Sequence, residues 1–67
     1  MKQIAPPLRG LLNRKEAAVY LGCSTRRVDD LRRAGFLPAR LDGREWKYTC
    51  EDLNMYIDAL PRNKALA

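Results

Sequence analysis

The stretch STRRVDDLRRAG, residues 24–35, constrains the fold of this chain more than any other. Ser24 is a favoured helix cap, because its hydroxyl can accept a hydrogen bond from a free backbone N–H of the first turn. Gly35 suits the left-handed position just past a helix end, and Pro38 cannot continue a helix. These signals predict a helix over residues 25–34. Because so short a helix is not stable alone in water, it must dock on other elements.

The predicted helix has two different sides. Val28 and Leu31 are three residues apart and mark the side that is buried. Three polar residues fall near the opposite side at about 100° per residue, Arg26, Asp30 and Arg33, and the helix also carries Arg27 and Arg32. Since the outer side carries no apolar residue, we interpret it as a free cationic face that can meet a polyanion such as DNA.

A second capped helix precedes this one. Asn13 and Glu16 have capping-box spacing, which predicts a helix over residues 14–21. Ala17 and Ala18 give it a small-residue edge that allows close approach of another helix. The order of helix, glycine-containing turn and capped helix has helix-turn-helix spacing. An αα-hairpin without a DNA-binding role is the alternative, and the arginines of the second helix favour the helix-turn-helix.

A short β-hairpin is predicted next, with strands over residues 39–41 and 45–48 and a turn at Asp42-Gly43. A two-stranded ribbon is marginally stable alone, so the helices must support it. We expect three apolar residues of the hairpin to anchor it and three cations to face outward: Leu41, Trp46 and Tyr48, then Arg40, Arg44 and Lys47. A basic hairpin after a helix-turn-helix is a wing, which lies along the DNA backbone or in a minor groove.

A third helix is predicted over residues 50–60, after the cap Thr49 and before Pro61. Its apolar residues recur at i, i+3, i+4 and i+7, which indicates one amphipathic stripe: Leu53, Tyr56, Ile57 and Leu60.

The fold class is therefore mainly α with a small β-hairpin, a winged helix-turn-helix. We expect a flexible N-terminal arm over residues 1–10, the DNA-binding domain over residues 11–60 and a C-terminal tail over residues 61–67. A chain of 67 residues forms one small domain with a thin core.

The charge balance is basic, with 13 Lys+Arg against 8 Asp+Glu and a formal net charge of +5. This balance favours a polyanionic partner, although a mildly basic solvated surface is the alternative. Two cysteines, Cys23 and Cys50, without any histidine do not make a zinc site, so no metal or cofactor is expected. We expect both cysteines to be small, partly buried residues, although a disulfide is possible by count.

Other classes of protein fit the sequence poorly. No apolar run has the length of a signal peptide or a membrane span, which predicts a cytoplasmic protein without a membrane partner. The acidic residues and Cys50 lack a histidine partner or a phosphate-binding loop, so we do not expect an enzyme.

Ordered groups of residues carry a family resemblance. The segments LNRKEAA and YLG open it, and the remaining matches follow in order: Ser24, Arg26, Val28, Leu31, Arg33, Gly35, Leu37, Pro38, Gly43-Arg44, Trp46-Lys47-Tyr48 and Glu51-Asp52-Leu53. Over residues 11–60 the chain resembles the excisionase-like winged helix-turn-helix family, related in fold to the DNA-binding domains of MerR-type regulators. Asp29 and Asp30 depart from it, since the family more often has an aromatic and a basic or neutral residue there.

The resemblance implies a protein that binds double-stranded DNA without doing chemistry. Excisionases of phages and mobile elements bind cooperatively near attachment sites, as several copies, and direct a site-specific integrase toward excision. We expect a monomer that binds beside other copies of itself. A small transcriptional regulator of the same fold is the first alternative, and a protein-interaction adaptor without DNA binding is the second.

The predicted DNA-binding residues are Ser24, Thr25, Arg26, Arg27, Arg33, Arg40, Arg44 and Lys47. Arg26 is the first candidate for base readout, because it lies near the N-terminal end of the helix that enters the major groove. Arg32 is expected only to cover the core with its stem. Asp29 and Asp30 either pair with Arg26 or Arg33, accept from a cytosine amino group, or bind a protein.

Overall fold

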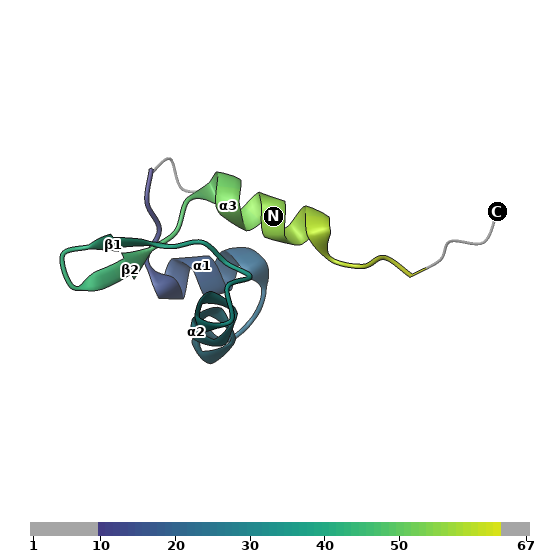
Figure 1. Ribbon diagram of the computed structural model, residues 1–67, viewed down its shortest axis with the longest axis horizontal. Helices are drawn as coiled ribbons and strands as arrows, with labels where there is room; N and C mark the ends of the chain where they lie inside the picture. Colours follow the sequence, from purple (N-terminus) through teal and green to yellow (C-terminus); the bar gives the residue numbers. More distant parts are fainter. Residues whose placement is uncertain (1–9, 64–67) are drawn as a thin grey trace, which may run out of the picture.

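The computed structural model describes residues 10–63, and the predicted arm and tail lie largely outside this range. The described part contains three helices and a two-stranded hairpin, drawn in Figure 1: α1 (Arg14–Leu21), α2 (Thr25–Arg33), β1 (Arg40–Asp42), β2 (Glu45–Lys47) and α3 (Cys50–Ala59). This arrangement confirms the predicted fold class, a mainly helical winged helix-turn-helix.

Each helix begins at the cap that the sequence predicts. Asn13 Oδ1 accepts from the Glu16 N–H at 2.8 Å, and Glu16 Oε1 accepts from the Asn13 N–H at 2.9 Å. Ser24 Oγ accepts from the backbone N–H three residues later at 3.1 Å, and Thr49 Oγ1 does the same at 3.1 Å. Because these bonds satisfy first-turn donors that a helix leaves free, they fix where α1, α2 and α3 start.

Two helix ends differ from the prediction by one residue. α2 ends at Arg33, because the backbone turns at Gly35 with a φ of 86°. The Phe36 N–H then reaches the Leu31 carbonyl at 2.9 Å, which closes a Schellman motif. α3 ends at Ala59, since Leu60 is extended (φ −67°, ψ 142°), as expected for a residue before a proline.

The hairpin forms as predicted, but its turn lies one residue later than the expected Asp42-Gly43. The pairs are Arg40 with Lys47, Leu41 with Trp46 and Asp42 with Glu45. The turn is therefore Gly43-Arg44, with a φ of 66° at Gly43. A two-residue hairpin of type II′ requires glycine at this first position, which explains why Asp42 joins the strand.

The segment before α1 holds the base of the wing in place. Tyr48 leaves β2 and pairs with Leu12 through two backbone hydrogen bonds of 2.8 Å. Both side chains are fully buried. The start of α1 and the base of the wing are thus joined directly, a contact that the sequence did not predict.

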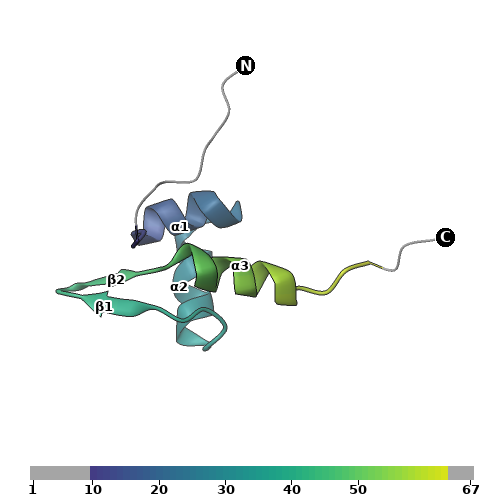
Figure 2. The same cartoon turned by 90° about the horizontal axis from the view of Figure 1, so that it is seen from above.

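The core lies where α1, α2 and α3 meet, next to the base of the wing. α1 contacts both other helices. The buried cluster draws on every helix and on the segments that follow α2 and β2: Ala17, Ala18, Val28, Leu31, Leu37, Tyr48 and Leu53. Figures 1 and 2 show the hairpin and α3 extending to opposite sides of the α1–α2 pair.

This shape corrects two predictions about burial. In the wing only Tyr48 is a core anchor, because Leu41 and Trp46 are 60% and 40% exposed. In α3 the stripe is buried only at its beginning. Leu53 is fully buried, whereas Ile57 is 41% and Leu60 45% exposed, since the far half of α3 extends beyond the other helices (Figure 2).

Candidate nucleic-acid interface

The cationic face of α2 is exposed, as the sequence predicts. Val28 and Leu31 dock the helix on the core. Arg26 and Arg27 are exposed in its first turn, and Thr25 is half-buried beside them. Helix geometry places Arg26 nearly opposite the two buried residues, so its guanidinium is available to an incoming ligand. The hydroxyl of Ser24 serves as the cap and retains its own proton as a donor.

The two aspartates of α2 each form an ion pair within the protein. Asp30 accepts a hydrogen bond from Arg33 at 3.3 Å, one of the pairings that the sequence suggested. Asp29 instead lies 3.6 Å from Arg14, at the start of α1. The predicted pairing of Asp29 with Arg26 or Arg33 was therefore wrong. Asp29 lies on the side of α2 that meets α1, which brings it to Arg14.

The wing carries the other predicted DNA contacts. Arg40 and Arg44 are exposed, with Arg44 in the turn. The Lys47 ammonium lies 3.2 Å from the Asp42 carboxylate and 3.7 Å from that of Glu45, and its side chain is 21% exposed. Lys47 is thus neutralised within the wing, which leaves Arg40 and Arg44 as its more available cations.

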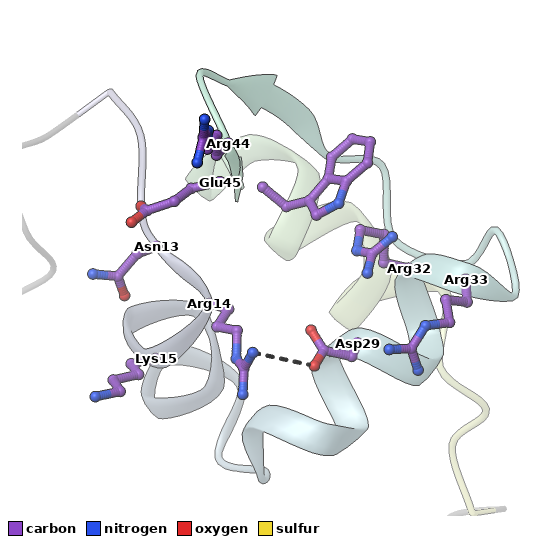
Figure 3. A pocket seen from close by; sticks show the side chains of 9 residues that line it. Asn13, Arg14, Lys15, Asp29, Arg32, Arg33, Arg44 and Glu45 are labelled. Carbon is purple, nitrogen blue, oxygen red and sulfur yellow. Dashed lines mark ion pairs between the residues drawn. The ribbon is translucent and has the colours of Figure 1, made fainter.

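A basic hollow lies between the start of α1, the side of α2 and the wing. Its volume is about 620 Å³. Figure 3 shows the side chains that line it, and they come from all three elements. Five cations and two carboxylates line it: Arg14, Lys15, Arg32, Arg33 and Arg44, with Asp29 and Glu45. We call this feature the basic hollow.

Arg32 joins α2 to the wing instead of only covering the core. Its guanidinium carbon lies 4.7 Å from the centre of the Trp46 ring, within the range of a cation–π contact. Its Nε and the Tyr48 hydroxyl are buried, and neither has a hydrogen-bond partner among the described residues. Burial raises the pKa of Tyr48 above its ordinary value, an effect that the nearby Arg32 opposes.

Three cations of the basic hollow are not among the residues predicted from the sequence: Arg14, Lys15 and Arg32. The capping box already places Arg14 and Lys15 in the first turn of α1. Their position beside the wing follows only from the bridge between Leu12 and Tyr48, which no sequence pattern indicates.

Other kinds of site find no support in the described part of the chain. Within residues 10–63, no cysteine or acidic residues gather into a group that could hold a metal ion. Cys23 and Cys50 are both half-buried and free. None of the helices described is long and apolar enough to cross a membrane.

Comparison with known proteins agrees with this architecture. No curated protein matches the sequence. The family model described as a helix-turn-helix domain matches residues 11–61, a range that contains α1, α2, the wing and α3. The chain therefore belongs to this helix-turn-helix domain family, a family of DNA-binding domains that includes excisionase-like proteins.

Proposed function

We propose that this protein is an excisionase that recognises specific duplex DNA through α2 and the wing. The observation that carries the proposal is the exposed cationic face of α2, on which Arg26 lies nearly opposite the buried Val28 and Leu31. Family membership supports sequence-specific DNA binding. The excisionase role, the partner integrase and the individual contacts are our further steps.

Arg26 is the proposed reader of bases. It lies in the first turn of α2, the part of such a helix that enters the major groove. A guanidinium can donate two hydrogen bonds to guanine O6 and N7, which contributes about 1–3 kcal/mol of discrimination. Ser24, Thr25 and Arg27 surround it and are proposed to contact base edges or phosphates.

Arg40 and Arg44 are the proposed phosphate contacts of the wing. Both are exposed, and Arg44 occupies the turn, from which it could enter a narrow minor groove. Arg33 and Lys47 are weaker candidates, because each must exchange a carboxylate partner for phosphate. Exposed ion pairs contribute only about 0–1 kcal/mol, so this exchange remains feasible for Arg33.

Binding of several copies on adjacent sites is the second part of the proposal. One module of this size buries only about 600–1,000 Å² against DNA, which limits the affinity of a single copy. An apolar hollow of about 490 Å³ between α3 and the segment that follows α2 supports contact between copies. Phe36 and Met55 border it and are 66% and 68% exposed.

A gel shift on DNA that carries one site or several tests this cooperativity. We expect a steeper transition on the DNA with several sites. Met55→Gln should remove the steepness and keep the single-site affinity. Val19→Gln is the matched control, because Val19 is 75% exposed and does not border the apolar hollow. Independent binding by the unmodified protein contradicts this part of the proposal.

Footprinting on the element that encodes the protein tests the excisionase role. Protection beside an integrase attachment site, with excision that depends on the protein, supports the proposal. Protection confined to a promoter identifies a transcriptional regulator of the same fold. If the protein shifts no duplex DNA, the alternative is a protein-interaction adaptor. The ion pairs of Asp29 and Asp30 argue against that role, because both carboxylates already have arginine partners.

A further inference from the structure

The basic hollow is a candidate binding site distinct from the reading face of α2. Arg26 and Arg27, the exposed arginines of the first turn of α2, do not line it. Its cations instead come from the start of α1, the later part of α2 and the wing turn. Figure 3 shows Arg14 and Arg32 on opposite sides of the same opening.

Contacts with the protein hold both of these guanidinium groups while leaving donors for a ligand. The Arg14–Asp29 separation of 3.6 Å is an ion pair too long for a charge-assisted hydrogen bond. Asp29 is only 17% exposed at its side chain, whereas Arg14 is 55% exposed. The Arg32 guanidinium carbon lies over the Trp46 ring and its Nε is buried, so the terminal N–H groups are the donors that a ligand would meet.

We infer that the basic hollow binds one phosphodiester group of duplex DNA, with Arg14 and Arg32 as its two principal donors. This inference rests on the proposed DNA-binding function. The hollow lies between α2 and the wing, the two elements proposed to contact neighbouring grooves. A DNA strand that separates those grooves passes between them, so one of its phosphates meets the hollow.

Duplex DNA is favoured over a free phosphate or nucleotide as the ligand of the hollow. Asp29 and Glu45 are part of the wall, and they offset part of the positive charge that the five cations give it. A phosphodiester carries a single negative charge, and the rest of the duplex supplies further contacts to α2 and the wing. The carboxylate of Asp29 is also a positioning group, since it keeps Arg14 at the edge of the hollow.

The salt dependence of DNA affinity tests whether the two arginines share one phosphate. Each phosphate neutralised contributes about 0.9 to the slope of log affinity against log salt. The double variant Arg14→Gln/Arg32→Met should therefore lose about 0.9 in total. Between 50 and 200 mM salt, its affinity then falls about 3.5-fold less than that of the unmodified protein.

Two outcomes overturn the inference. A loss of about 1.8 in slope means that the arginines contact separate phosphates, and an unchanged slope means that the hollow binds none. Arg62→Gln is the matched control, because Arg62 is exposed beyond α3 and does not line the hollow. If the unmodified protein binds no duplex DNA, the proposed function fails; if only the slope fails, the function stands without this site.

A lysine variant separates binding from folding. Arg14→Lys/Arg32→Lys keeps both charges, so its slope should match that of the unmodified protein even if its stability is lower. Circular dichroism establishes that each variant is folded at the temperature of the binding assay. A slope that stays low in the lysine variant overturns the assignment of a charge-based phosphate contact.

The fluorescence of Trp46 distinguishes DNA phosphate from free anions. Trp46 is the single tryptophan of the chain and lines the hollow. Its emission should change on titration with duplex DNA, and millimolar inorganic phosphate should leave it unchanged at constant ionic strength. A saturable response to inorganic phosphate that DNA displaces would instead assign the hollow to a free anion.

Discussion

Truncation of two leucines of the same helical stripe tests how α3 is packed. Leu53 and Leu60 occupy equivalent places in the sequence pattern, but Leu53 is fully buried and Leu60 is 45% exposed. Leu53→Ala removes buried apolar surface and leaves a cavity in the core, which costs about 2–5 kcal/mol. Leu60→Ala leaves no enclosed cavity, and about half of the side chain is already in water, so we expect about 1 kcal/mol or less.

The consequence for folding should be large, because a small domain has little stability to lose. A core of this size rarely supplies more than about 3–5 kcal/mol of net stability. Leu53→Ala should thus be mostly unfolded at 25 °C. Leu60→Ala should unfold cooperatively, at a urea concentration near the midpoint of the unmodified protein. Urea denaturation followed by circular dichroism at 222 nm, repeated at two protein concentrations, measures both effects.

Equal losses of stability for the two variants would refute this account of α3. A loss for Leu60→Ala that grows with protein concentration would show that a second copy buries the far half of the helix even without DNA. A loss of the same size at every concentration would place that half against the domain itself.

Two further predictions concern a cap and a buried tyrosine. Ser24→Ala should lower the stability by about 1 kcal/mol, measured by urea denaturation, because the Arg27 N–H loses its acceptor; Ser24→Asp should retain most of it. Stability should also fall as the pH rises above about 10, because burial raises the pKa of Tyr48 in the folded protein and the unfolded chain ionises first. This contribution is fully present below the unfolded-state pKa and is lost as the pH rises through the folded-state value. Tyr48→Phe should reduce this loss of stability at alkaline pH. If the variant has the same dependence of stability on pH as the unmodified protein, other groups cause the loss.

Local signals explain why so much of the fold could be predicted from the sequence. Asn13, Ser24 and Thr49 each bond to a backbone N–H only three residues away, so the positions of the helix starts depend on neighbouring residues alone. The hairpin was predicted from similarly local chemistry. Its turn lies one residue later than predicted, because Gly43, at a φ of 66°, takes the first loop position.

The parts that could not be predicted depend on contacts between distant residues. Leu12 and Tyr48 are far apart in the sequence but pair through their backbones. This bridge brings the start of α1 beside the wing. Arg32 illustrates the consequence. Its position on the helix predicted only that its aliphatic stem would cover the core. In the folded chain Trp46 lies close enough to give its guanidinium a cation–π contact.

The acidic residues of α2 show the same distinction within one pair. Asp30 meets Arg33, three residues along the same helix, which helical spacing could predict. Asp29 meets Arg14 on another helix, which requires knowledge of how α1 and α2 cross. Both aspartates are therefore already engaged with arginines before any ligand binds.

The most direct test of the central claim compares the unmodified protein with Arg26→Ala on two DNAs. The first is a duplex selected by the unmodified protein from a random pool, and the second is a random duplex of equal length. Arg62→Ala serves as the matched control. Loss of a bidentate contact of about 1–3 kcal/mol should reduce the ratio of specific to random affinity about 5- to 150-fold. An equal loss of affinity for both DNAs would contradict the account, because Arg26 would then contact only phosphate and α2 would not read the sequence through it.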